Sequence, residues 1–205
     1  MTLLTESEQQ QVAEAIDRVE LHTDAELVTV LAGQADDYRY IPLLWASLIA
    51  LLVPGAVVFF TQWLSAGYML IAQWAVFIVL ALLFRIPAMT TRLIPKTVRY
   101  WRASNLARRQ FIEQNLHHTD GETGILIFVS EAEHYVEILA DRGISSRIDN
   151  AVWESIVARF TADVRNGQVL QGFLHCIEAC GEHLQREVPA THERNELSNR
   201  LVVLP

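Results

Sequence analysis

Four carboxylates between positions 120 and 141 are the residues whose type and spacing best suit chemistry. They are Asp120, Glu122, Glu137 and Asp141. Hard divalent cations bind to carboxylate and carbonyl oxygens in proteins. If the fold brings the four side chains together, they predict an acidic cation site, for which calcium and magnesium are the candidates.

Each of these carboxylates also has a simpler structural interpretation. Asp120 precedes a glycine, and Asp-Gly is a common turn sequence. Asp141 precedes Arg142 and Gly143, which suits a turn in which the aspartate bonds to the backbone. Glu137 lies on the less apolar face of a predicted strand, where it can pair with a surface cation. The sequence alone does not decide between a metal site and these structural roles.

Phosphate-ester hydrolysis requires more than carboxylates. It needs positive charge on the phosphoryl oxygens, and a nucleophile or an activated water. Arg142 and Arg147 flank the acidic turn and are the available cations. The sequence contains no Gly-rich phosphate loop. The pattern therefore favours a protein that is not an enzyme, with a phosphatase as the alternative.

The two cysteines and two nearby histidines form a second group of metal-ligand types. Cys176, Cys180 and His183 share one side of a predicted helix, and His175 is adjacent in sequence. Structural zinc usually takes ligands from turns or separate elements, and buried free cysteine behaves as a small apolar residue. We therefore expect both thiols to lie in the core, without a disulfide.

Basic residues gather in one stretch of the chain. The residues predicted to contact lipid headgroups are Arg92, Lys96, Arg99 and Arg102. Each basic residue at an anionic membrane surface contributes about 1 kcal/mol. All 24 acidic residues lie outside positions 38–112, and the 8 basic residues that also lie outside leave those parts with a formal charge of −16. Such an acidic surface excludes nucleic acid as a partner, because nucleic-acid binding depends on neutralising phosphates.

Two apolar runs, at about 41–63 and 68–84, contain no charged side chain. Each is long enough to cross the hydrocarbon core as a helix. Basic residues flank the pair on one side, so the hairpin predicts a multi-pass membrane protein with both termini in the cytoplasm. Because neither run holds an ionisable residue, we expect an anchor, with self-association as an added role.

The rest of the chain alternates between helical and strand patterns. The predicted elements are a helix starting after Thr5, a strand at 25–31, a helix at 97–116, strands at 124–129 and 134–140, a helix capped by Asp149 or Asn150, and a helix from about 169 to 186. The short connector between the last two strands predicts an antiparallel hairpin. This order predicts one α/β domain, a small mixed sheet with helices on its faces and a transmembrane hairpin inserted.

The predicted organisation has four segments. Residues 1–37 supply a helix and a strand, which are too small to fold alone and must pack against residues 96–189. Residues 38–95 hold the transmembrane hairpin and its basic flank. Residues 190–205 form a polar tail that we expect to be loosely held.

Several motifs between 116 and 189 support a family resemblance. They are Thr123-Gly124 opening a strand, the Val129-Ser130 turn, the Val-Glu-Ile-Leu-Ala-Asp-Arg-Gly-Ile run at 136–144, and Trp153 in the following helix. This pattern resembles the TPM domain family, and more narrowly its short membrane-bound bacterial members. The resemblance implies a small α/β sandwich. Some members are described as acid phosphatases, and others as assembly or repair factors for membrane complexes.

Together these features predict a membrane-anchored cytoplasmic domain at the bacterial inner membrane. Its expected role is that of an accessory or interaction module, whose partners are the lipid bilayer and either a membrane protein or a second copy of the chain. The alternative is an acid phosphatase-like hydrolase that depends on a divalent ion.

Overall fold

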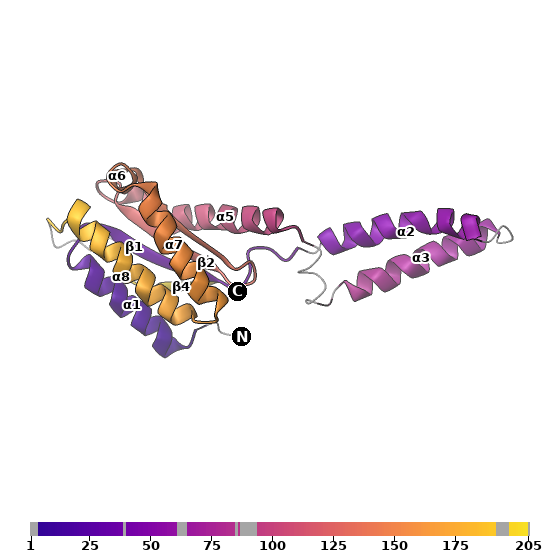
Figure 1. Cartoon of the computed structure of the whole chain (residues 1–205), viewed down its shortest axis with the longest axis horizontal. Helices are drawn as coiled ribbons and strands as arrows, with labels where there is room; N and C mark the ends of the chain where they lie inside the picture. The colour runs from indigo at the N-terminus through magenta and orange to yellow at the C-terminus, as the bar shows by residue number, and fades with distance from the viewer. Residues whose placement is uncertain are drawn as a thin grey trace. The chain divides into compact units, whose positions relative to one another are not determined.

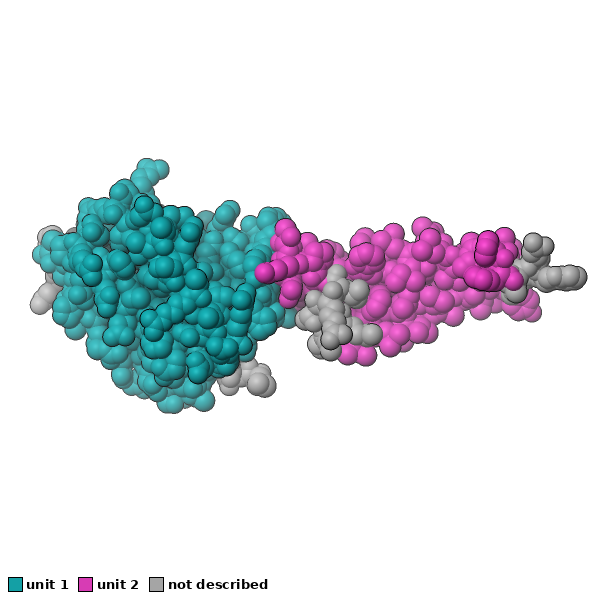
Figure 2. Space-filling view, viewed as in Figure 1, with its two compact units in different colours: residues 1–35, 100–205 teal, residues 36–99 magenta. Residues whose placement is uncertain are grey.

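The computed structural model describes residues 4–38, 40–60, 65–84, 86, 94–191 and 197–204. These residues form two compact units, coloured separately in Figure 2. The first unit consists of residues 1–35 and 100–205, and the second of residues 36–99. The first unit holds the sheet and the candidate sites, while the second holds the two apolar helices.

The first unit is built on a four-stranded sheet in the order β3-β2-β1-β4. Strands β1 (Glu26–Ala32) and β2 (Gly124–Ser130) are parallel, and β3 (Tyr135–Ala140) is antiparallel to β2. The fourth strand, β4 (Leu201–Leu204), runs parallel to β1 at the opposite edge. The mixed sheet and the antiparallel hairpin are therefore confirmed.

Helices cover both faces of this sheet (Figure 1). One face packs against α1 (Glu6–Glu20), α7 (Asn150–Arg165) and α8 (Val169–Glu187), and the other against α5 (Lys96–Glu113). Two short elements complete the unit, the 3-10 helix η1 (Leu116–His118) and α6 (Arg142–Ser145). The long helix predicted at 97–116 ends earlier because Asn115 adopts a left-handed backbone conformation, with φ of 59°.

The sheet is buried on both faces at its centre. Every residue of β1 and β2 is buried, and successive side chains alternate between the two helical layers. Leu27 and Ile125 lie in the cluster with α1, α7 and α8, whereas Val28 and Phe128 lie in the cluster with α5. This confirms the expectation that the run at 124–129 is a central strand covered on two sides.

Close packing between α7 and α8 shows why glycine stands in the middle of a helix. The rings of Phe160 and Phe173 meet edge to face, with centroids 5.0 Å apart. A Cβ atom on Gly172 would lie 2.6 Å from the Phe160 ring. The missing side chain therefore allows the α8 backbone to approach this aromatic pair.

Local capping agrees with the sequence-based expectation. The side chain of Thr5 accepts a hydrogen bond from the Glu8 amide, and Glu8 Oε2 accepts one from the Thr5 amide at 2.8 Å. Asp149 Oδ1 accepts from the amide of Ala151 at 2.9 Å, so Asp149, not Asn150, is the cap of α7. Both caps satisfy N–H groups that have no partner within their helices.

The second unit contains two helices long and apolar enough to cross a membrane, α2 (Tyr40–Phe60) and α3 (Ala66–Leu83). Their mean hydropathies reach 2.4 and 2.1. They lie side by side as a hairpin, with Ala46 and Ala50 buried on α2 (Figure 1). The outer surfaces remain apolar and open, as shown by Phe59 at 81% exposure. The predicted end of the first span, at 61–63, lies outside the described residues.

The expectation that the C-terminal segment is loosely held is wrong for residues 201–204. These four residues form β4, which pairs with Thr29–Ala32. Leu201 is buried in the cluster with α1, α7 and α8. A four-residue apolar run gives only a weak pattern, and its strand partner lies about 170 residues away, so local sequence did not predict the pairing.

Candidate functional site

Three loops meet where β1 and β2 begin and β3 ends. The amide of Asp141 donates to the carbonyl of Gly124 at 2.9 Å, and the amide of Gly143 donates to the carbonyl of Glu122 at 3.0 Å. The hydroxyl of Thr123 donates to the carbonyl of Asp24 at 3.0 Å. The loops before β1, before β2 and after β3 are therefore joined at one end of the sheet.

This arrangement brings three of the predicted carboxylates to neighbouring loops. Asp120 and Glu122 are exposed, and Asp141 is half-buried. Asp141 Oδ1 accepts from the amide of Arg142 at 2.7 Å, so the side chain caps α6. Its predicted structural role as a turn former is therefore present in the structure.

Glu137 lies apart from the other three carboxylates. It stands opposite Phe128 in the middle of β3, and its Oε1 accepts from the hydroxyl of Ser104 on α5 at 3.3 Å. Within the described ranges no three His, Cys, Asp or Glu side chains are grouped as a metal site would require. A cation held by the loop carboxylates therefore remains a prediction.

A pocket of about 290 Å³ lies beside Asp141, between α5 and the end of β3. Arg108, Phe111 and Ile112 line it from α5, and Leu139 and Ala140 line it from β3. Its wall is thus mainly apolar, with one cation and one carboxylate.

The two arginines expected to assist phosphate chemistry have different surroundings. Arg147 Nη1 donates to the carbonyl of Glu187, at the C-terminal end of α8, at 2.9 Å. This bond satisfies a terminal helix carbonyl and places a positive charge at the negative end of the helix dipole. Arg142 is exposed at the start of α6. Arg108, which the sequence did not single out, lines the pocket instead.

The first two turns of α5 carry basic and aromatic side chains. Lys96 is exposed, whereas Arg99 and Arg102 are half-buried. The guanidinium of Arg102 lies 5.1 Å from the ring centre of Trp101, which is 58% exposed. Of the four predicted headgroup ligands, Arg92 lies outside the described residues.

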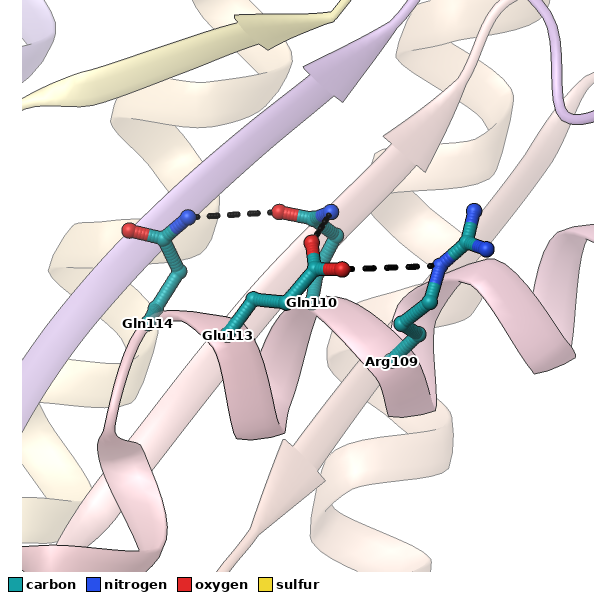
Figure 3. A network of polar contacts seen from close by, with 4 residues as sticks. All are labelled: Arg109, Gln110, Glu113 and Gln114. Carbon is teal, nitrogen blue, oxygen red and sulfur yellow. Dashed lines mark hydrogen bonds and ion pairs between the residues drawn. The ribbon is translucent and has the colours of Figure 1, made fainter.

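The C-terminal half of α5 is fixed by a polar network (Figure 3). The buried Gln110 donates to Glu113 and accepts from Gln114 at 3.2 Å. Arg109 Nε lies 3.7 Å from Glu113 Oε1. Because Gln110 has partners for both ends of its amide, α5 can bury this polar residue against the sheet.

Both cysteines lie in the core, as expected. Cys176 and Cys180 are buried and unbridged on α8. Burial raises the pKa of the Cys176 thiol well above its ordinary value, and the neighbouring Cys180 adds to that shift. A neutral, buried thiol is a poor metal ligand and a poor nucleophile.

The structure also shows a carboxylate cluster that the sequence analysis missed. Glu26 is only 5% exposed, and Glu20 on α1 lies near it. Both residues sit at positions that local patterns assign to a helix end and a strand start. A buried acidic residue inside an apolar strand, as Glu26 is, was the available signal.

These features define an α/β domain interrupted by an apolar helical hairpin. Residues 90–183 match the model of the TPM domain family. This match confirms the resemblance to the TPM domain family that the motifs at 123–153 predicted. The matched segment includes the loops around Asp120, Glu122 and Asp141, and it begins before α5.

A solved structure has a similar fold. It is the NMR structure of the BA42 protein from the psychrophilic bacterium Bizionia argentinensis, with a TM-score of 0.61 and 16% sequence identity. The similarity covers 98% of this chain and 94% of that one. At this identity the likeness shows the fold alone. No curated protein sequence matches the chain.

Proposed function

We propose that this chain is a membrane-anchored TPM domain that serves as an interaction module for a membrane complex. In this proposal the α2–α3 hairpin spans the bacterial inner membrane, and both termini lie in the cytoplasm. The observation behind it is the outward apolar surface of the hairpin. Leu51 is 67% exposed and Leu82 is 60% exposed, and α3 has no buried residue.

A lipid environment accounts for that surface physically. Exposed apolar area costs about 25 cal/mol per Å² in water, and a bilayer removes this cost. Both helices lie in the connection between β1 and β2. A membrane-spanning hairpin at this position would anchor the domain through a segment that links two neighbouring strands of its sheet. Within the helices themselves the backbone hydrogen bonds are internal, as a bilayer requires.

The basic residues near the start of α5 support the proposed orientation. Lys96, Arg99 and Arg102 follow the second apolar helix within about 20 residues, the range in which basic residues retain a segment in the cytoplasm. The Nε–H of Arg99 is buried without a hydrogen-bond partner in the described part of the chain. A lipid phosphate is a suitable acceptor for these groups.

The contacts made by the candidate residues favour interaction over catalysis. Asp141 caps α6, Glu137 bonds to Ser104, and Arg147 bonds to Glu187. These side chains are used to hold elements together. A catalytic set would require a nucleophile, a base and an oxyanion donor that converge on one point.

The second candidate is a hydrolase that depends on a divalent ion and acts on phosphate esters. The specific observation in its favour is the pocket lined by both Arg108 and Asp141. Asp120 and Glu122 lie in the adjoining loop and would hold calcium or magnesium. In that arrangement Arg108 would balance the charge of the phosphoryl oxygens.

Purification from membranes in mild detergent, with and without added calcium or magnesium, distinguishes the two candidates. An interaction module should co-purify with a stoichiometric membrane protein or as a defined homo-oligomer, and should not hydrolyse p-nitrophenyl phosphate. A monomer that hydrolyses this ester only in the presence of the cation, and loses the activity in Asp141→Asn, would contradict the module and establish the hydrolase.

A further inference from the structure

Strand β3 is an edge of the sheet, and no strand pairs with its outer side among the described residues. The amide of Asp141 donates to the carbonyl of Gly124 in β2, so alternate residues from Asp141 backwards direct their backbone groups toward β2. The amides and carbonyls of Val136, Ile138 and Ala140 therefore point away from the sheet. In the described part of the chain, no other segment forms a backbone hydrogen bond with them. This side of β3 can accept another strand.

The two edges of the sheet differ in how they are protected. Natural proteins protect exposed edges with short strands, prolines or charged side chains. The opposite edge strand, β4, has four residues, and Pro205 follows it in sequence. Strand β3 has six residues, of which five are half-buried, and its one charged side chain is Glu137. Strand β3 is thus the less protected edge, as a strand that pairs with a partner needs to be.

Helix α5 covers the face of β3 that carries Glu137 and Leu139. Oε1 of Glu137 accepts from Ser104, whereas Oε2 is buried without a hydrogen-bond partner among the described residues. One helical turn after Ser104, Arg108 lines the pocket beside Leu139 and forms no ion pair with a described carboxylate. The carboxylate and the guanidinium therefore lie on neighbouring elements but at different positions along β3.

A two-fold axis at Ile138 would bring these opposite charges together. If two copies of β3 pair antiparallel with each Ile138 opposite the other, Glu137 of each copy lies opposite Leu139 of the second. Arg108, which lies beside Leu139, then faces the carboxylate of the second copy, and the symmetry gives this contact twice. An axis at Glu137 would instead place two carboxylates opposite each other, which is unfavourable. The charges therefore favour the register centred on Ile138.

We propose that β3 is the contact surface for a second copy of this chain, and that Arg108 of each copy pairs with Glu137 of the other. The two four-stranded sheets then join into one. On the side of α7, Val136 of each copy faces Ala140 of the other, so a larger apolar side chain meets a smaller one. The inference rests on the proposed function, because it identifies a second copy as the partner of the interaction module.

Disulfide trapping tests the register in the full chain, purified in detergent micelles. Ile138→Cys places two thiols across the proposed axis, where opposed residues have Cα atoms about 5.5 Å apart. A disulfide spans Cα distances of about 4.4–6.8 Å. Mild oxidation should convert most of this variant to a covalent dimer on a non-reducing gel. Val203→Cys is the control, because Val203 is exposed on the other edge strand, and it should stay mainly monomeric.

Charge reversal tests the proposed ion pairs. Arg108→Glu and Glu137→Lys each place like charges at both contacts of a homodimer. Each variant should raise the dimer Kd by about tenfold, measured by light scattering over a concentration series. A one-to-one mixture should recover the wild-type Kd, because the introduced charges meet each other and the two unchanged residues also meet. Pairing within one chain does not predict this recovery.

Two further measurements serve as controls for the charge variants. Arg159→Glu reverses an exposed charge on α7 and should leave the dimer Kd unchanged. Thermal unfolding by circular dichroism verifies that each variant is folded. Ile138→Cys retains both charges, so it tests the interface independently of how well the reversed variants fold.

Three results would overturn the pairing through β3. They are a wild type that is monomeric throughout the concentration series, cross-linking of Ile138→Cys no greater than that of Val203→Cys, and a mixture that dimerises no better than its two components. A different protein cross-linked to Ile138→Cys would also overturn it, by assigning this edge to another partner. All four results leave the membrane-anchored interaction module intact, because co-purification and the topology of the hairpin test that function separately.

Discussion

Gly143 and Glu122 join the two acidic loops through a backbone hydrogen bond. The amide of Gly143 donates to the carbonyl of Glu122 at 3.0 Å. The approach is so close that a Cβ atom on Gly143 would lie 2.2 Å from the carbonyl oxygen of Gly121. The relative position of Asp120, Glu122 and Asp141 therefore depends on the absence of a side chain at residue 143.

Gly143→Ala should destabilise the first unit. Two backbone segments would have to separate to admit the methyl group, and overpacking of this kind costs about 1–3 kcal/mol. Thermal unfolding followed by circular dichroism should show a lower Tm than the wild type. Gly55→Ala is the control, because its Cβ would meet no atom within 4 Å. Equal Tm values for Gly143→Ala and wild type would contradict the close approach.

Calcium and magnesium should have at most a small effect on stability. A ligand that binds only the folded state at a hundredfold excess over Kd stabilises it by about 2.7 kcal/mol. If the loop carboxylates hold a cation weakly, Asp141→Asn should abolish the small rise in Tm. Asp149→Asn should leave it unchanged, because asparagine also caps α7. A rise of more than about 10 °C in wild type would instead indicate a tight metal site.

The proposed topology predicts the location of three reporter fusions. Fusions at the N-terminus and after residue 205 should report the cytoplasm, and a fusion in the connector between α2 and α3 should report the opposite side. The physical reason is the basic residues that follow the hairpin. Alkaline phosphatase and green fluorescent protein are complementary reporters. A periplasmic signal from either terminus would refute the orientation.

The two thiols should resist modification in the native protein. Cys176 and Cys180 are buried, and the raised pKa of Cys176 keeps its thiol neutral at pH 8. A thiol reagent such as Ellman's reagent should label neither residue in detergent and both in guanidinium chloride. Leu21→Cys, at a residue that is 75% exposed, provides a positive control. Rapid labelling of the native wild type would place the thiols at an accessible surface.

The sequence predicted those elements that depend on residues close together in the chain. The capping box at Thr5, the cap at Asp149 and the β2–β3 hairpin each depend on residues a few positions apart. The length and composition of the two apolar helices also belong to this class, because a helix forms its own backbone hydrogen bonds. The motifs from Thr123 to Trp153 likewise predicted the resemblance to the TPM domain family, whose model matches residues 90–183.

The candidate site was predicted less completely. Asp141, Glu122 and Asp120 do lie in adjoining loops, but Glu137 turns to Ser104 on α5, and Arg108 replaces Arg142 and Arg147 beside the pocket. Strand alternation assigned Glu137 to a face, yet it could not show which helix covers that face. The helix that does so follows the apolar hairpin in sequence and packs on the sheet from the opposite side to α7.

By itself, then, the sequence determined the long helices, the hairpin of strands, the apolar pair and the family resemblance. Only the tertiary structure decided the β4–β1 pairing, the acid cluster of Glu20 and Glu26, and the close contact at Gly143. The reason is the range of the interactions. Periodicity and caps act within a few residues, whereas the β4–β1 pairing joins segments about 170 residues apart and the contact at Gly143 joins two loops about 20 residues apart. Glu20 and Glu26 are neighbours in the sequence, but their removal from water arises only when the chain has closed around one core.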